Sequence, residues 1–423
     1  MRSSSVILAG IASGGIKKLN AVEPSGRNLN AKKGERMMKR LLFLILSATI
    51  VVGSVFVGWA QEKKEPYKIG VVNNSTGATG TFGIMQNNGV ELAAEVINKA
   101  GGVNGHPIVP IIYDGETKPD VNLRMARKLI QQDKVKVLIG PNFTPGIGSI
   151  APLVNEVKIP MIKFGGYIVN PIKDPYVFSV TVDNEVMAQG IVEYYRGKGI
   201  KKIAIAAVKT SYGEEYLASY KKYLAKYPDM MIVATEWFMP EDTDITPQIS
   251  KLIAIKPDVI GACSFGANSI QVVRTAYKLG FKGPVGVTHS EANEAYAESI
   301  KDIPAGYSLI PARNACIKAL VDAMPAGPRK AWSLKIMGDW EKKFGSLRHI
   351  EIGSVGYEAL DIYAKALKAV GYDSEKVKQW LESTEIMTSV GPIRMTPTDH
   401  VGSNPKDAVV ALTTENGRFL PAK

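Results

Sequence analysis

The chain has few of the residues that most often carry catalysis or hold metal ions. It contains four histidines and two cysteines in 423 residues. The histidines (His106, His289, His349 and His400) are scattered, with no His-Glu-x-x-His motif and no cluster spaced for a metal. No Gly-x-Ser-x-Gly nucleophile elbow occurs either. The sequence therefore predicts a protein that is not an enzyme and has no metal or cofactor.

The two cysteines leave two interpretations open. Cys263 and Cys316 could form a disulfide in an oxidising compartment, but a sequence does not show whether two thiols are close. We favour the alternative, in which both are small buried hydrophobic residues.

Positive charge is in excess, but most of the excess lies near the N-terminus. The net charge is +12, and residues 1–60 hold nine Lys or Arg against two Asp or Glu. This segment therefore accounts for seven of the twelve charges, and the remaining +5 is spread among interspersed charges of both signs. No basic surface with interleaved aromatic residues stands out, which argues against a nucleic-acid partner.

Residues 37–60 have the pattern of a secretory signal peptide. Lys39 and Arg40 precede a long apolar segment that ends in Gly58-Trp59-Ala60, and no cysteine follows to mark a lipoprotein. A cleaved signal predicts a periplasmic protein. The apolar segment 41–60 is also long enough to span a membrane, which leaves an uncleaved anchor as the alternative.

Residues 1–36 precede the signal and show no periodicity. We expect an unstructured upstream extension, with translation beginning at Met37 or Met38.

Apolar runs and amphipathic segments alternate along the rest of the chain. A first series predicts strands at 67–72, 108–114, 135–140 and 159–164, with helices at 84–100, 119–133 and 147–157. A second series predicts strands at 201–208, 257–264 and 283–287, with helices at 213–227, 245–255 and 267–279, and a last strand at 408–419. The continuous apolar runs are typical of strands buried on both faces of a parallel sheet. Two such series predict an α/β fold with two doubly wound lobes.

The first strand-to-helix loop contains Gly77, Gly80 and Gly83, spaced Gly-x-x-Gly-x-x-Gly. The dinucleotide fingerprint needs Gly-x-Gly-x-x-Gly, and no Lys-Ser or Lys-Thr follows to complete a P-loop. The loop therefore does not indicate a nucleotide.

Two further loops are suited to a smaller anion. In PNFTPG (141–146), Thr144 is placed as a helix N-cap and Pro145 as the first helical residue, so a hydroxyl and free N–H groups could meet a carboxylate. In KFGGY (163–167), Gly165-Gly166 permits close approach to the backbone. Simple helix capping and a plain turn are the alternatives. Ligands of doubly wound sheets bind beyond the carboxyl ends of the strands, where such loops meet.

These segments together resemble the leucine/isoleucine/valine-binding proteins of ABC importers, which are type I periplasmic solute-binding proteins. The resemblance covers nearly the whole chain after the signal. It rests on YKIGVV followed by STGATGTFG, on NGVELAAEVINKAGGVNGHPI, on LIGPNFTPGIGSIAPLVNEVKIPMI, on KKIAIAAVKTSYGEEYLASYKKYL, on IVATEWFMPEDTDITPQISKLIAIKPDVI and on PAGYSLI.

The resemblance implies a hinged protein that closes around a solute. Lobe 1 would comprise residues 66–181 and 311–391, and lobe 2 residues 182–310 and 392–423. It also implies a monomer whose partners are a small-molecule solute (a branched-chain or related amino acid, or an organic acid) and the membrane permease subunits of an ABC transporter.

Matching the family's ligand-binding positions one at a time implies a set of eight ligand-binding residues: Phe82, Thr144, Gly165, Tyr167, Tyr212, Phe265, His289 and Glu291. Either Glu291 or His289 would face the ligand's ammonium group. The chain departs from the family at Lys163-Phe164-Gly165-Gly166-Tyr167, where a hydroxyl residue is missing. This departure leaves open a second solute class, aromatic or other organic carboxylates. A membrane-anchored sensor ectodomain is a third alternative.

Overall fold

The computed structural model describes residues 64–181, 184–313, 315–403 and 408–422, with Gly34 and residues 36–38. Nearly all of the predicted upstream extension and signal peptide lies outside the described residues. Residues 64–423 belong to one compact unit. No helix within the described ranges is both long and apolar enough to cross a membrane.

The N-terminal part of this unit is built on a parallel sheet of five strands in the order β2-β1-β3-β4-β5. The strands are β1 (Tyr67–Asn73), β2 (Ile108–Asp114), β3 (Leu138–Ile139), β4 (Met161–Lys163) and β5 (Val177–Ser179). The helices that connect them are α2 (Gly80–Lys99), α3 (Pro119–Gln131) and α4 (Thr144–Val157).

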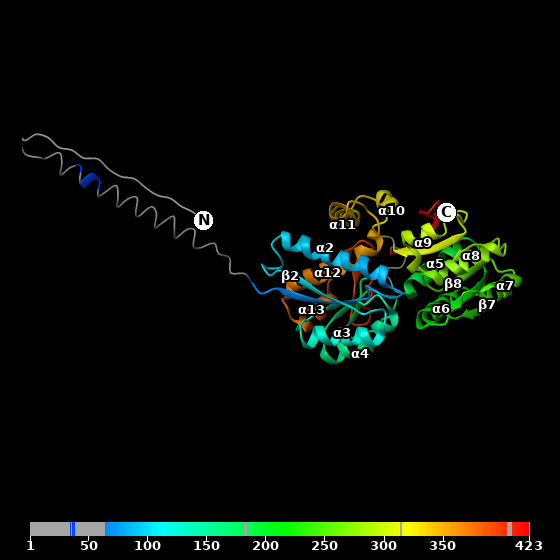
Figure 1. The fold of residues 1–423 in the computed structure, drawn as a ribbon, viewed down its shortest axis with the longest axis horizontal. Coiled ribbons are helices and arrows are strands. Elements are labelled where there is room, and N and C mark those ends of the chain that lie inside the picture. The colour runs from blue at the N-terminus through cyan, green and yellow to red at the C-terminus, as the bar shows by residue number, and fades with distance from the viewer. Residues whose placement is uncertain are drawn as a thin grey trace, which may run out of the picture. The chain divides into compact units, whose positions relative to one another are not determined.

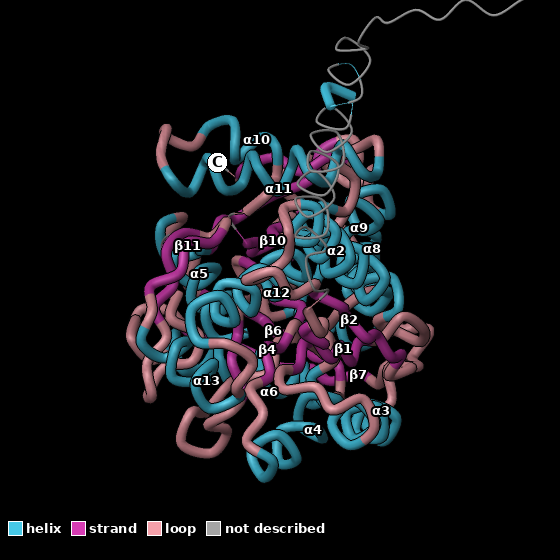
Figure 2. Tube along the Cα trace, turned by 90° about the vertical axis from the view of Figure 1, so that its left-hand side faces the viewer, coloured by secondary structure: helices cyan, strands magenta, loops and turns pink. Residues whose placement is uncertain are grey.

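Helices cover both faces of this sheet, because neighbouring residues of each strand point to opposite faces. In β1, Ile69 and Val71 pack in a core with α2 and with α12 (Ile350–Val370), whereas Val72 packs in a core with α3 and α4. Figure 1 shows α2 and α12 on one side of the strands and α3 and α4 on the other, and Figure 2 shows the same layers from a second direction. The first strand series is therefore doubly wound, as predicted.

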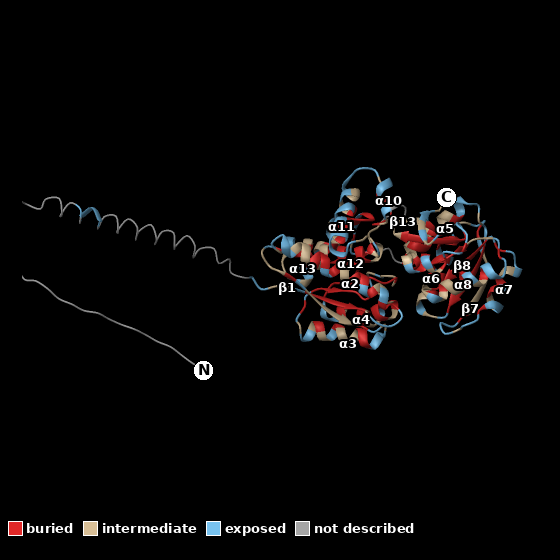
Figure 3. Cartoon of the chain, turned by 45° about the horizontal axis from the view of Figure 1, so that its top comes forward, coloured by how far each residue is buried: buried red, intermediate tan, exposed pale blue. Residues whose placement is uncertain are grey.

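The second sheet has seven strands in the order β14-β13-β10-β9-β8-β6-β7. They are β6 (Lys202–Val208), β7 (Met231–Phe238), β8 (Val259–Cys263), β9 (Val285–Gly286), β10 (Ser308–Arg313), β13 (Val409–Glu415) and β14 (Arg418–Pro421). Strands β6 to β10 are parallel, and β13 and β14 are antiparallel to their neighbours. One face carries α5 (Asn184–Gly197) and α6 (Ser211–Leu224), and the other carries α7 (Thr246–Ala254) and α8 (Ala267–Lys278). Figure 3 shows the buried strands of both sheets enclosed by helices with exposed outer faces.

The remaining elements follow β9 and β10. They are η1 (His289–Glu291), α9 (Glu294–Ser299), α10 (Lys318–Ala323), α11 (Pro328–Phe344), α13 (Ser374–Ser383), β11 (Glu385–Thr388) and β12 (Gly391–Arg394). The chain thus returns from the second sheet to the first, where α12 packs on α2. The Tyr363 hydroxyl of α12 donates hydrogen bonds to the carbonyls of Leu138 and Pro160 at 2.9 and 2.8 Å.

The expected strand at 408–419 is in fact a hairpin of β13 and β14. Its turn places Asn416 and Gly417 at φ 50° and 75°, a conformation that suits an Asn-Gly pair between two strands. The sequence prediction contained the turn but not the reversal of direction.

Five strands in the described part of the chain were not predicted from the sequence: β5, β7, β10, β11 and β12. Strand β7 lies at the edge of its sheet, with residues that are mostly only half-buried, so its sequence is not a continuous apolar run. Strand β5 is only three residues long. Both cysteines are buried and free, which agrees with their interpretation as small hydrophobic residues.

Candidate functional site

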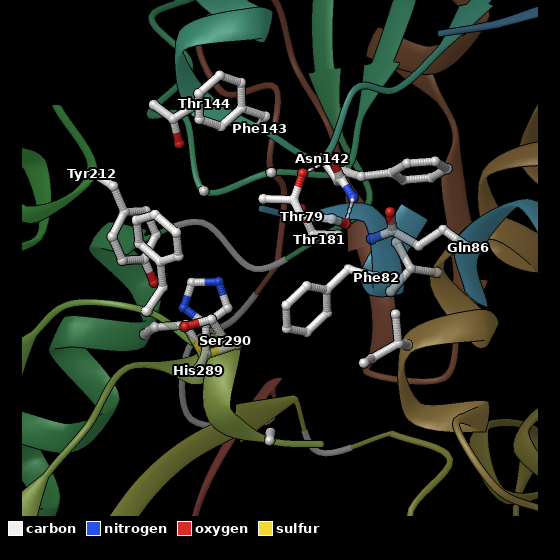
Figure 4. Close-up of a pocket in the computed structure, with 18 of the residues that line it drawn as sticks. Thr79, Phe82, Gln86, Asn142, Phe143, Thr144, Thr181, Tyr212, His289 and Ser290 are labelled. Atoms are coloured by element: carbon white, nitrogen blue, oxygen red, sulfur yellow. Dashed lines mark hydrogen bonds between the residues drawn. The ribbon is translucent and has the colours of Figure 1, made fainter. Parts of the chain in front are cut away.

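The carboxyl ends of strands from both sheets surround a cavity of about 240 Å³. The loops after β1, β3 and β4 line one wall, the loops after β6, β8 and β9 line the opposite wall, and the end of β10 and the start of α12 complete it. Its volume is below the roughly 300–1,000 Å³ of sites for drug-sized ligands, so the cavity suits a small solute. Figure 4 shows the rings of Phe82, Tyr212 and His289 directed toward the same open space.

Helix α2 begins four residues earlier than expected, so the glycine-rich loop is partly helical. Gly80 is its first residue, and Gly83 lies in its first turn. A Cβ at Gly83 would lie 1.7 Å from the carbonyl oxygen of Asn74, a separation that no side chain tolerates. This glycine therefore lets the helix start close against the end of β1, which brings Phe82 and Gln86 to the cavity.

A network of side-chain amides and hydroxyls supports the wall formed by the first sheet. Asn142 accepts hydrogen bonds at its Oδ1 from Asn74 Nδ2 (2.6 Å) and Thr79 Oγ1 (3.0 Å), and its Nδ2 donates to the Thr79 carbonyl (3.1 Å). The bond between Asn142 and Thr79 is visible in Figure 4. These bonds join the loops after β1 and β3, so this wall is held in place before any ligand arrives.

Thr144 lies at the start of α4 and lines the cavity. The N-cap of this helix is Phe143 rather than Thr144, so the prediction was displaced by one residue, and the cap makes no side-chain hydrogen bond. Thr144 is 5% exposed, and its hydroxyl makes no hydrogen bond with the described part of the chain. The first N–H groups of any α-helix also lack partners within the helix. The start of α4 thus presents unpaired donors to the cavity.

Aromatic side chains dominate the wall formed by the second sheet. Tyr212, at the start of α6, makes an edge-to-face contact with Phe265 at a ring-centroid distance of 5.4 Å. The His289 ring lies 6.4 Å from Tyr212 and stacks on Tyr216 at 6.3 Å. Burial, with a smaller contribution from the charge of Lys163, lowers the pKa of His289 to about 4, so this imidazole is neutral at physiological pH.

Six of the eight predicted ligand-binding residues line the cavity: Phe82, Thr144, Gly165, Tyr212, Phe265 and His289. Their roles toward a ligand stay predictions. Two other predicted residues, Tyr167 and Glu291, are not among the residues that line it.

Tyr167 and Glu291 are occupied elsewhere. The Tyr167 hydroxyl donates to Asp174 at 3.0 Å. Glu291 is 1% exposed, and its Oε1 accepts hydrogen bonds from the Gly266 N–H (2.9 Å) and from Ser290 Oγ (3.0 Å). Burial raises the pKa of Glu291 to about 7 in spite of these bonds.

The cavity also contains polar residues that the sequence did not indicate. Gln86, Arg313 and Glu351 line it, and they come from α2, the end of β10 and the first turn of α12. The Oε1 of Glu351 is buried and has no partner among the described residues, and burial raises the pKa of Glu351 to about 8. Gln86 lies four residues after Phe82 on the same helix face, which is the one signal that could have identified it.

A model of the periplasmic binding protein family matches residues 66–415. The chain belongs to this family. It is of the leucine/isoleucine/valine-binding type, and its two doubly wound sheets form the type I fold of such proteins.

Among its relatives is the leucine-, isoleucine-, valine-, threonine- and alanine-binding protein of Pseudomonas aeruginosa, 26% identical over 375 residues. The alignment covers 85% of this chain and 92% of that protein. The leucine-specific-binding protein of Salmonella typhimurium is 25% identical over 294 residues, which cover 66% of this chain and 79% of that protein.

Two solved structures have the same fold. An extracellular ligand-binding receptor from Rhodopseudomonas palustris HaA2 has a TM-score of 0.77 and 22% identity, with 85% of this chain and all of that chain covered (100%). The branched-chain amino acid transporter substrate-binding protein of Streptococcus pneumoniae, in complex with isoleucine, has a TM-score of 0.71 and 18% identity. The alignment covers 84% of this chain and 97% of that chain. The names of these four proteins describe binding proteins and receptors, and none describes an enzyme.

Proposed function

We propose that this chain is the solute-binding protein of an ABC importer and that it captures a small apolar amino acid or a related carboxylic acid. The observation that carries the proposal is the largely apolar cavity at the carboxyl ends of both sets of strands, with unpaired donors at the start of α4. Relatives named for binding branched-chain amino acids support the amino acid as the first solute class to test.

Capture would proceed by closure of two lobes around the solute. The proposed lobe boundaries are 66–181 with 311–391, and 182–310 with 392–423. Strand order supports this division in outline, because β1 to β5 form one sheet and β6 to β10, β13 and β14 belong to the other. Strand β10 (Ser308–Arg313) crosses the proposed boundary at 311 and stays in the second sheet to its last residue. Hinge closure of this kind would present a closed form to the permease subunits. The predicted signal at 37–60 would deliver the protein, as a monomer, to the periplasm.

The solute's carboxylate would bind at the start of α4. An anion is stabilised there by the helix N–H groups and dipole, and Thr144 adds a hydroxyl that makes no hydrogen bond within the described ranges. The Phe82, Tyr212 and Phe265 rings would enclose the apolar body of the solute.

The amino group is the point that separates the two solute classes. A buried ammonium needs an acidic partner, because an unpaired buried charge is costly. Within the described residues, Glu351 is the acidic side chain that lines the cavity, and its Oε1 is unpartnered, whereas Glu291 lies outside the lining. We therefore propose Glu351, in place of Glu291, as the partner of an α-ammonium group.

A thermal-shift screen of the purified protein tests the proposal. Leucine, isoleucine and valine are compared with the same acids lacking the amino group and with aromatic acids. A ligand at about a hundred times its dissociation constant adds roughly 2.7 kcal/mol to stability, enough for a shift of several degrees. A shift with the amino acids supports the first class, and a shift only with the desamino or aromatic acids supports the second. No shift with any of these acids would refute the proposed function.

A further inference from the structure

The amide of Gln86 is oriented by the backbone, and its nitrogen is left for the cavity. Asn73 Oδ1 accepts from the N–H of Asn74 (3.0 Å), so Asn73 Nδ2 is the donor on that side chain. The two hydrogens of this Nδ2 are shared among Asn87 Oδ1 (3.1 Å), Gln86 Oε1 (3.2 Å) and the Gly83 carbonyl (3.3 Å). Because the oxygen of Gln86 faces Asn73, its Nε2 points the other way, and in Figure 4 the Gln86 amide projects toward the cavity. Nε2 makes no hydrogen bond with the described residues.

Arg313 is a second donor at the cavity with incomplete hydrogen bonding. Its side chain is 10% exposed, and its Nη2 pairs with Glu358 Oε2 at 2.8 Å. Glu358 is 1% exposed, and its other oxygen accepts from Trp332 Nε1 (3.1 Å) and from the N–H of Ser389. The guanidinium is therefore held firmly on one side. Its Nε and Nη1 are buried and have no partner among the described residues.

Helix α12 packs against both of these residues, which line the same cavity. Its Gly356 lies directly against Gln86, since a Cβ there would be 1.9 Å from the Gln86 carbonyl oxygen. Two residues later on the same helix, Glu358 binds Arg313. Ile352 and Val355 of α12 line the cavity. Residues two apart on an α-helix project to nearly opposite sides, so α12 positions Gln86 on one side of these cavity-lining residues and Arg313 on the other.

The charges in this region favour a neutral oxygen over a second carboxylate. Arg313 is already neutralised by Glu358, so a buried carboxylate would add one uncompensated negative charge. Glu351, which lines the same cavity, would add to the repulsion whenever it is ionised. Unpaired N–H groups nevertheless need acceptors, because a buried donor without one is costly.

We propose that the unpaired donors of Gln86 and Arg313 give the cavity further polar positions, at which either residue recognises a neutral carbonyl or hydroxyl oxygen of the solute away from its carboxylate. The inference rests on the proposed function, in which the solute's carboxylate binds at Thr144. It narrows the solute from any apolar acid to an acid with a neutral hydrogen-bond acceptor distant from its carboxylate.

Affinities for matched ligands test this inference by titration calorimetry. The ligands are compared in sets of three (trios). The members of a trio have the same shape and differ only in the group farthest from the carboxylate, which is an isopropyl group, an amide or a second carboxylate. One trio is homoleucine, glutamine and glutamate, and another is para-isopropylbenzoate, para-carbamoylbenzoate and terephthalate. In at least one trio, the amide should bind about tenfold or more tightly than the isopropyl compound, and more tightly than the carboxylate.

Variants then assign the effect to the two residues. Gln86→Leu removes the amide, and Arg313→Lys keeps a cation beside Glu358 but removes the other guanidinium nitrogens. At least one of the two variants should abolish most of the amide's advantage while leaving the affinity for the isopropyl compound nearly unchanged. Gln379→Leu, on the exposed face of α13, is the matched control and should change neither affinity. If Gln86→Leu fails to fold, Gln86→Glu keeps an acceptor toward Asn73 and should lose the same advantage.

The outcomes separate this inference from the proposed function. The inference would be overturned if the isopropyl and amide compounds bind equally tightly, or if the carboxylate compound binds most tightly. It would also be overturned if the variants lose the same affinity for both the isopropyl and the amide compounds. The inference would also be overturned if an acid from the thermal-shift screen binds but neither amide ligand does. In each of these cases the carboxylate site at Thr144 still stands. Absence of binding by every acid in the screen and the trios refutes the proposed function itself.

Discussion

The two walls of the cavity differ in what holds them and in what they offer a solute. The wall from the first sheet consists of helix starts and amides that are joined by hydrogen bonds from Asn142 to Asn74 and Thr79. The wall from the second sheet consists of rings, with Tyr212 in contact with Phe265 and His289. The amides joined by hydrogen bonds thus lie on the first wall, and the rings of Tyr212 and Phe265 on the second wall add to the apolar surface that Phe82 supplies from the first.

This difference follows from the cost of each kind of contact. A polar group recognises a ligand only if its geometry is fixed in advance, because ordering it during binding consumes affinity. Aromatic contacts depend less on exact position, since most of their contribution comes from buried area. We infer that the first wall sets the orientation and chemistry of the solute and that the second wall mainly encloses it.

The largest expected effect comes from breaking the support of the polar wall. Gly356→Ala would place a Cβ 1.9 Å from the Gln86 carbonyl oxygen, so α2 and α12 must separate. Overpacking of this kind should destabilise the protein by about 3 kcal/mol, measured by urea unfolding. Gly338→Ala in α11 is the control, because a Cβ there meets nothing within 4 Å and should slightly stabilise the helix. Equal stability of the two variants would contradict the tight contact.

The pH dependence of stability should reveal the buried carboxyl group of Glu351. Its pKa rises from 4.5 to about 8 on folding, so the folded state binds more protons than the unfolded state between these values. Wild-type stability should therefore lose up to about 4 kcal/mol from this group as the pH rises from 4.5 to 8. Glu351→Gln should remove that loss. If the free energy of unfolding changes with pH in the same way for the variant and the wild type across this range, the pKa of Glu351 is not raised by folding.

Removing the Thr144 hydroxyl tests the polar wall directly. Thr144→Val should weaken binding by about 1–3 kcal/mol if a charged carboxylate loses a buried donor. Thr246→Val is a close control, because Thr246 also begins a helix just before a proline but lies outside the cavity. Calorimetry with a solute found in the screen supplies both affinities. Unchanged affinity in Thr144→Val would remove Thr144 from the site.

The smallest effect is expected at the aromatic wall. The Tyr212 hydroxyl is buried without a hydrogen-bond partner in the described part of the chain, so Tyr212→Phe should change affinity by less than about 0.5 kcal/mol. Tyr212→Ala removes the ring and should cost about 1–2 kcal/mol of binding. A large loss in Tyr212→Phe would show that this wall also binds by hydrogen bonding, and the distinction between the walls would fail.

The sequence predicted the first sheet better than the second. Strand β2 has the predicted bounds 108–114, because its apolar run is bounded by turn residues on both sides. Strand β7 and strand β10 were missed, since one is half-exposed and the other carries Pro311 and Arg313 within a short segment. The hydrophobic pattern of a strand predicts it well where both of its faces are buried. The pattern predicts it poorly where the strand lies at the edge of a sheet or ends at the cavity.

The candidate site shows the same division. Thr144 was reached from its strand-to-helix loop, and Phe82 and Tyr212 were reached from the resemblance to the family. Glu351 and Arg313 were not, because α12 and β10 come to the cavity from a part of the chain that is remote from those loops. Glu291 and Tyr167 lie in the expected loops, yet neither lines the cavity, and both make other hydrogen bonds.

The sequence by itself determined the α/β class, the burial of the strands and the helix starts that face the cavity. These depend on periodicity, glycine positions and capping, which act over a few residues. Tertiary structure alone decided which side chains meet across the cavity and which atoms are left without partners. That outcome depends on the packing of α12 against α2, where glycines at positions 89 and 356 allow the two backbones to touch. Contacts between residues more than 200 positions apart leave no local pattern, so only the folded chain shows that Gln86 and Arg313 share one cavity.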